Sequence, residues 1–360
     1  MRQQPLSRLV ATGLTLTVLI GALWGGTPRA QAQQPASAFL TVLDQNGVPV
    51  TNLEASQVSM TIDGVACTPV TLQPINWPMK LTVLIDNGAS SPDALVPTSL
   101  AVAPNTRLES STVWASSLPD LREGLRRFLF EVPEGVETAL VTLAPQPRWV
   151  VRPTAERQDF WRGIDLVVPD RGAARFLEGL AEAADRIDRG PPDAFSTIMI
   201  VTTNNPDGSG GDWQRMFNRL REQLARRPVT VHALVLSVSE QRSTGTAAGS
   251  TVVGGTSPAA INSVSSRVGL ALKTSGSLQT QVGLALTQDT GGRYEAIALA
   301  NKLLTLLPDF ARQIARSHAL QSNQYRIRCE GSAPAAGQVS VFTTYPGARN
   351  ILLSRDGHIP

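Results

Sequence analysis

One stretch of this sequence places a carboxylate and hydroxyl groups directly after an apolar run. The run occupies residues 81–85, and the residues that follow it are Asp86, Asn87, Gly88, Ala89, Ser90 and Ser91. Carboxylate and hydroxyl oxygens are the ligands that a hard cation such as Mg²⁺ prefers. The alternative role of Asp86 is structural, because Asp side chains also accept hydrogen bonds in turns and at helix starts.

The placement of this stretch follows from four short apolar runs that have the length of buried strands. They are LTVLI (81–85), TALVTLA (138–144), TIMIVT (197–202) and VTVHALVL (229–236). Segments with apolar residues at helical spacing separate them. This alternation predicts an α/β fold with a doubly wound, mostly parallel sheet. Ligands bind outside the carboxyl ends of such strands, so the residues after each run are candidates for a site.

The helical segments carry apolar stripes that begin near Ser117, Phe176, Trp213 and Leu303. We interpret these stripes as helix faces that pack in the core. The stretch 239–266 is rich in Ser, Thr, Gly and Ala and has no apolar period. We expect a mobile surface loop there.

Segments near both ends of the chain have β character. Residues 58–62 alternate between apolar and polar before a turn at Asp63-Gly64, and the alternation returns from Tyr325 onward. Each end has too few strands to bury a core alone, so we predict one small β domain built from both. The predicted boundaries are 36–78 and 321–360 for the β domain and 79–320 for the α/β domain.

The two cysteines of the chain, Cys67 and Cys329, lie in different terminal β segments. The strands that carry them become neighbours if the segments share one domain, so we predict a disulfide between them. The alternative is two thiols that are buried separately. A separation of the Cα atoms above about 7 Å would favour that alternative.

The first 32 residues have the layout of a secretory signal peptide. Arg2 and Arg8 precede an apolar run at 9–24, and a small-x-small triplet at 30–32 follows. We expect cleavage after Ala32 and export to the periplasm or out of the cell, with no membrane span in the mature chain. The alternative is an uncleaved membrane anchor, for which this run is short.

The overall charge excludes some partners. The 360 residues include 32 Lys and Arg and 29 Asp and Glu, and Arg2, Arg8 and Arg29 lie in the first 32 residues, which hold no acidic residue. Without that segment 29 basic residues balance 29 acidic ones. The mature chain therefore offers no electrostatic case for binding nucleic acid or an anionic membrane.

Four features, taken in order, resemble the von Willebrand factor type A domain, and in particular exported bacterial proteins that carry it between terminal β segments. They are FLTVLDQNGVPVTNL (39–53), LTVLIDNGASS (81–91), TGGRYEAI (290–297) and NQYRIRC (323–329). The resemblance covers most of residues 38–360. It implies a Rossmann-type domain that binds a protein partner at the strand ends, where metal-using members accept an acidic ligand from the partner.

The resemblance also implies where a metal site would lie and how far this chain departs from it. The family pattern is Asp-x-Ser-x-Ser, with a Thr on a later loop and Thr-Asp-Gly after a central strand. Asp86 and Ser90 match, whereas Gly88 stands at the first Ser and Ala173 at the Thr. The central strand ends in TTNN (202–205).

The metal site motif, known as MIDAS, is thus degenerate in this sequence. Only Asp86 supplies a charge at a matched position, although Asn204 or Asp207 could still reach the site. We expect no cofactor and at most weak Mg²⁺ binding through Asp86 and Ser90. A second departure is the insertion 92–117, which forms either a lid over the strand ends or a variable surface loop.

Enzyme functions find little support in the sequence. Of the three histidines, His232 lies inside an apolar strand, where we expect a packed residue, and His318 and His358 lie on the last helix and at the tail. The sequence contains no Gly-x-Ser-x-Gly elbow, no Gly-rich phosphate loop after a strand and no Cys/His set with zinc spacing.

We therefore expect an exported, non-enzymatic binding module that presents its strand-end face to an unidentified protein partner. The candidate residues of that face are Asp86, Asn87, Gly88, Ser90, Ser91, Asn204 and Asp207. One alternative is an envelope scaffold or assembly protein without a ligand site. Another is a hydrolase-like enzyme that uses Asp86 or Ser90.

Overall fold

The computed structural model describes residues 37–89, 112–237, 277–330, 337–355 and 357. The proposed signal peptide, Ser90, Ser91, most of the insertion 92–117 and the expected loop 239–266 lie outside these residues. The predictions for those segments stay predictions.

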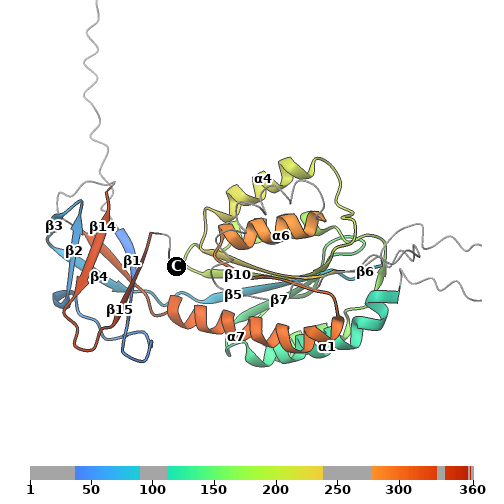
Figure 1. The fold of residues 1–360 in the computed structure, drawn as a ribbon, viewed down its shortest axis with the longest axis horizontal. Helices are drawn as coiled ribbons and strands as arrows, with labels where there is room; N and C mark the ends of the chain where they lie inside the picture. The colour runs from blue at the N-terminus through green and yellow to red at the C-terminus, as the bar shows by residue number, and fades with distance from the viewer. Residues whose placement is uncertain (1–36, 90–111, 238–276, 331–336, 356, 358–360) are drawn as a thin grey trace, which may run out of the picture. The chain divides into compact units, whose positions relative to one another are not determined.

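A sheet of six strands forms the centre of the α/β part (Figure 1). Its order is β12 (Tyr294–Ile297), β11 (Val229–Leu236), β10 (Phe195–Thr203), β5 (Met79–Ile85), β7 (Glu137–Thr142) and β8 (Arg148–Thr154). Neighbouring strands are parallel except β8, which runs antiparallel to β7. Every residue of β10 is buried, as expected of a central strand that helices cover on both faces.

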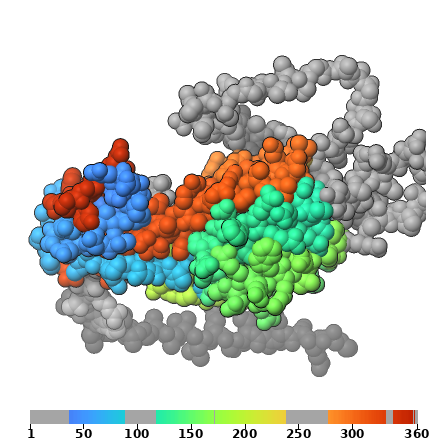
Figure 2. Space-filling model, turned by 90° about the horizontal axis from the view of Figure 1, so that it is seen from below, coloured from blue at the N-terminus to red at the C-terminus, as the bar shows by residue number. Residues whose placement is uncertain are grey.

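Helices cover both faces of this sheet. One face packs against α1 (Thr112–Glu131), α2 (Arg157–Asp165) and α7 (Leu303–Gln321), with the short 3₁₀ helix η4 (Ala300–Lys302) before α7. The other face packs against α3 (Phe176–Asp188), α4 (Trp213–Leu224) and α6 (Leu278–Asp289). Figure 2 shows α7, in orange, beside α1, in teal. The predicted doubly wound, mostly parallel fold is confirmed.

Two features of this domain differ from the sequence prediction. The first helix begins at Thr112, whereas the apolar pattern placed its start after Ser117. Residues 112–117 add no regular apolar stripe, and Pro119 inside a helical pattern is typical of a helix start, so the sequence favoured a later beginning. The elements α2, α6, β8 and β12 were not predicted; β8, for example, is an edge strand with one buried residue, Val151, and lacks regular alternation.

Strands from both ends of the chain form two antiparallel sheets, which confirms the small β domain. One sheet contains β15 (Asn350–Ser354), β1 (Ser37–Leu43), β13 (Tyr325–Cys329) and β4 (Val70–Pro74). The other contains β14 (Val339–Thr343), β2 (Val58–Ile62) and β3 (Val65–Cys67), with the 3₁₀ helix η1 (Ala55–Gln57) before β2.

The hairpin and the disulfide of this domain also agree with the sequence. Asp63 and Gly64 have φ angles of 50° and 81°, which suit the tight turn between β2 and β3. Cys67 and Cys329 form a disulfide with a Cα separation of 5.7 Å. The alternative of two separate buried thiols is therefore excluded.

Candidate functional site

Asp86 lies where the sequence placed it, at the carboxyl end of β5 beside the end of β10. Its backbone N–H donates to the carbonyl oxygen of Val201 at 2.9 Å. The residue is 2% exposed. Its carboxylate is thus inside the molecule, below the surface that we expected it to form.

Four hydrogen bonds surround the Asp86 carboxylate. Oδ2 accepts from the hydroxyls of Thr202 and Thr203 at 3.1 and 2.7 Å and from the backbone N–H of Thr203 at 3.0 Å. Oδ1 accepts from the N–H of Gly88 at 2.9 Å. Burial raises the pKa of Asp86 above its ordinary value, and these hydrogen bonds act in the opposite direction.

Gly88 lies under the loop that contains the other predicted ligand position. A β-carbon at Gly88 would come within 2.8 Å of both the carbonyl oxygen of Gly172 and the nitrogen of Ala174. The short strands β6 (Gly88–Ala89) and β9 (Asp170–Arg171) pair in parallel here. A serine at position 88 would therefore need the later loop to move.

Asn87 joins the same two loops to the end of β7. Its side-chain Oδ1 accepts from the N–H groups of Leu143 and Ala144 at 3.1 and 2.9 Å, and its Nδ2 donates to the carbonyl oxygen of Val168 at 3.0 Å. The residue is buried. All the side-chain contacts described for Asn87 are therefore internal.

Asp207 accepts hydrogen bonds at the start of α3. Its Oδ1 accepts from the N–H of Phe176 at 2.7 Å, which satisfies a donor at the start of α3. The same oxygen accepts from the N–H and hydroxyl of Ser209 at 3.2 and 3.0 Å. Burial raises the pKa of Asp207, and these hydrogen bonds counteract the rise.

Asn204 extends the strand pairing, since its N–H donates to the carbonyl oxygen of Leu236 at 3.1 Å.

The described residues do not fit a strong divalent-cation site. Asp86 already accepts four hydrogen bonds, position 88 has no room for a side-chain oxygen, and Ala173 has none to offer. Within the ranges that the structure covers, no three His, Cys, Asp or Glu side chains gather in a group that could hold a metal ion. The structure instead brings Asp86, Asn87 and Gly88 together in a buried hydrogen-bond network.

Beside this network lie two exposed apolar residues that no sequence motif indicates. Leu166 and Val168 are 57% and 52% exposed. They line a small cavity of about 170 Å³ together with Asn87, Ala144 and Arg148. A run of apolar residues before Pro169 was visible in the sequence, but only the structure shows that its middle residue, Val167, is buried while its neighbours are exposed.

The segment that carries these residues is held at both ends. The guanidinium of Arg122 on α1 donates to the carbonyl oxygens of Asp165 and Val167, both at 2.8 Å. At the other end Asn87 donates to Val168. Because its carbonyl groups are bound to two other elements, the segment presents its apolar side chains from a fixed backbone.

His232 is a packed strand residue, as predicted. It lies on β11, is 2% exposed and accepts a hydrogen bond at Nδ1 from the N–H of Arg293 at 3.0 Å. Its ring meets that of Phe310 on α7 edge to face. Burial, and to a smaller degree the charge of Arg293, lowers its pKa to about 4.

Comparison with known proteins found no matching family model and no matching curated protein. Among solved structures, a von Willebrand factor type A protein from Catenulispora acidiphila is 11% identical with a TM-score of 0.42, and the match covers 80% of this chain and 51% of that one. Proximal thread matrix protein 1 from the mussel byssus is 13% identical with a TM-score of 0.41, with coverages of 68% and 49%. This chain thus spans about half the length of these two proteins.

A third similar structure is the conserved hypothetical protein BatB from Bacteroides thetaiotaomicron. It is 13% identical with a TM-score of 0.37, and the match covers 67% of this chain and all of that one. Likenesses of this size concern the fold alone. The sheet order and the helices on both of its faces make the fold of this protein a doubly wound α/β domain.

Proposed function

We propose that this protein is an exported, non-enzymatic module that binds a protein partner at the strand-end face without a metal ion. The observation that carries this proposal is that Leu166 and Val168 are exposed on a backbone segment held in place by hydrogen bonds. Their exposed fractions of 57% and 52% are large for aliphatic side chains on a backbone held in place by Arg122 and Asn87. Exposed apolar groups beside a polar rim are typical of protein contact sites.

The closed carboxylate supports the metal-free part of the proposal. A partner that supplied an acidic ligand to a cation would need an open coordination position next to Asp86. The four hydrogen bonds to Asp86 and the packing at Gly88 occupy that space. Contact must then use apolar and polar complementarity around Leu166 and Val168.

The surroundings of the site support a binding role over catalysis. The buried Asp86 is surrounded by donors, and His232 is enclosed between β11 and α7. Neither side chain is placed to exchange a proton with a substrate in solvent, as general acid–base catalysis requires.

Two observations support export. The sequence layout of residues 1–32 is that of a secretory signal peptide. The disulfide between Cys67 and Cys329 is a bond that persists in oxidising compartments.

No described helix combines the length and apolar character that crossing a membrane would require.

A photo-crosslinking amino acid in place of Leu166 tests the proposal in the native cell. Val48, which is 55% exposed in the β domain, is the matched control position. We expect one protein to crosslink from position 166 and not from position 48. The absence of an adduct from position 166, or the same adducts from both positions, would contradict the proposal.

A further inference from the structure

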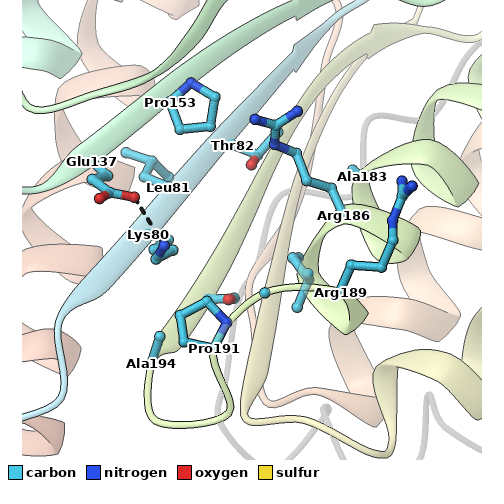
Figure 3. Close-up of a pocket in the computed structure, with 13 residues that line it drawn as sticks. Lys80, Leu81, Thr82, Glu137, Pro153, Ala183, Arg186, Arg189, Pro191 and Ala194 are labelled. Carbon is cyan, nitrogen blue, oxygen red and sulfur yellow. Dashed lines mark ion pairs between the residues drawn. The ribbon is translucent and has the colours of Figure 1, made fainter.

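A second candidate site lies at the amino ends of the strands, whereas Asp86 lies at a carboxyl end. At the amino ends of β5, β7 and β10, the end of α3 leaves a cavity of about 440 Å³ (Figure 3). We call it the basal pocket. The lining residues that matter here are Lys80, Thr82, Glu137, Arg186, Arg189 and Ser196.

The basal pocket has an excess of positive charge. Lys80 forms an ion pair with Glu137 at 3.0 Å, which uses the carboxylate that lines the pocket. In the described parts of the chain, no carboxylate lies within ion-pair distance of Arg186 or Arg189. Three cations and one anion leave a surplus of two positive charges.

Both arginines are positioned by contacts that do not neutralise them. The guanidinium carbon of Arg186 lies 4.5 Å from the centre of the Trp149 ring. Nε of Arg189 donates to the carbonyl oxygen of Asp185 at 3.0 Å, which leaves its terminal N–H groups for another acceptor. Figure 3 shows both side chains projecting from α3, with Lys80 and Glu137 on the strands.

The negative partial charge at the C-terminus of a helix explains part of this arrangement. Cations in the last turn stabilise a helix, and Arg186 and Arg189 both lie at the end of α3. That effect does not account for the hydroxyl groups on the sheet. Thr82 and Ser196 are nearly buried, both line the pocket, and neither hydroxyl has a hydrogen-bond partner among the described residues.

The remaining wall is apolar. Ala183 and Ile187 on α3 and Ala194 before β10 line it, so the pocket combines an apolar surface with polar groups at fixed places. This combination and the cavity volume are typical of small-molecule sites. A ligand that matches the surplus charge has two acidic groups and a short apolar body between them.

We propose that the basal pocket binds a small aliphatic dicarboxylate. One carboxylate accepts hydrogen bonds from Arg186 and Arg189, whose forked N–H groups suit a planar anion. The other meets Lys80 and the hydroxyls of Thr82 and Ser196. This site is independent of the strand-end face, since its residues lie at the other ends of the strands.

Adipate is the probe for this proposal, and NMR titration of the full mature chain is the measurement. We expect saturable shifts of the Thr82 and Ser196 amide signals. Dimethyl adipate, which lacks the charges, should give none. Hexanoate, with one carboxylate, should bind about tenfold more weakly, a difference of about 1.4 kcal/mol.

Variants locate the site. Arg189→Gln leaves the contact of Arg186 with Trp149 in place and should weaken adipate binding about tenfold. Arg215→Gln is the matched control, because the side chain of Arg215 is 86% exposed on α4, outside the pocket. No saturable binding of adipate up to about 50 mM, equal binding to both variants, or equal affinity for hexanoate would overturn the proposal.

Discussion

The hydroxyl of Thr203 lies 2.7 Å from Oδ2 of Asp86, and both residues are buried. This bond joins the carboxyl ends of β10 and β5, the strands after which the sequence predicts the candidate metal-site residues. Asp86 thus connects two strands of the sheet. Replacement of Asp86 should therefore lower the stability of the fold.

Asp86→Ala should lower the free energy of unfolding by about 2–4 kcal/mol, because it leaves the buried N–H and hydroxyl of Thr203 and the N–H of Gly88 without their acceptor. Asp212→Ala is the control: Asp212 is exposed and caps α4 through the N–H groups of Gln214 and Arg215. That change should cost about 1 kcal/mol. Urea unfolding measures both, and equal losses would contradict a structural role for Asp86.

Gly88→Ser restores the sequence pattern of the metal site but should not restore the site. The new β-carbon would meet backbone atoms of Gly172 and Ala174, so we expect a loss of about 1–3 kcal/mol and no stabilisation by Mg²⁺. Gly210→Ser is a control, because the nearest atom to a β-carbon there is 3.9 Å away. Thermal unfolding with and without Mg²⁺ is the measurement. A rise of the melting temperature on adding Mg²⁺ to Gly88→Ser would contradict the prediction and show that the loop at Gly172 can move.

The α/β fold was predictable because its central strands are strongly apolar. Runs such as 197–202 must be buried on both faces, and their alternation with helical stripes leaves few other arrangements. The edge strand β8 was not predictable, since only Val151 of its seven residues is buried. The edge of a sheet imposes little pattern on its sequence.

The candidate site shows a similar division. The sequence placed Asp86 at the end of a strand, but it could not show that the loop at Gly172 lies directly over Gly88. Such contacts join segments more than eighty residues apart. The exposure of Leu166 and Val168 likewise depends on Arg122, a distant residue on another helix.

Stability should fall in acid because of His232. The folded state lowers the pKa of His232 from 6.5 to about 4, so the unfolded chain binds a proton between these values while the folded protein does not. The contribution of His232 to the free energy of unfolding is therefore greatest above pH 6.5. It falls by about 3 kcal/mol as the pH decreases towards 4.

His232→Asn tests this contribution, because asparagine can still accept the hydrogen bond from Arg293 but does not titrate in this range. Urea unfolding of both proteins between pH 7 and pH 4 is the measurement. The variant should lose about 3 kcal/mol less over this interval. Parallel pH profiles for the two proteins would show that His232 is not the group responsible.

Reduction of the disulfide should destabilise the protein strongly. Cys67 and Cys329 are 262 residues apart, and the chain-entropy model gives on the order of 5 kcal/mol as an upper limit for a loop of this length. Unfolding with and without reductant measures the effect. Replacement of both cysteines by Ser should reproduce the reduced protein and remove the response to reductant; a response that remained in this variant would contradict the assignment.

The most direct test of metal-free binding uses the protein that crosslinks from position 166. Its affinity for the purified chain is measured for the wild type, for Leu166→Glu and for the control Val48→Glu, each with Mg²⁺ or with EDTA. We predict equal affinity in both buffers, an unchanged affinity for Val48→Glu and a loss of at least about tenfold for Leu166→Glu, because a charge would be desolvated at the contact. Binding that requires Mg²⁺, or that is the same for Leu166→Glu and the wild type, would contradict the account.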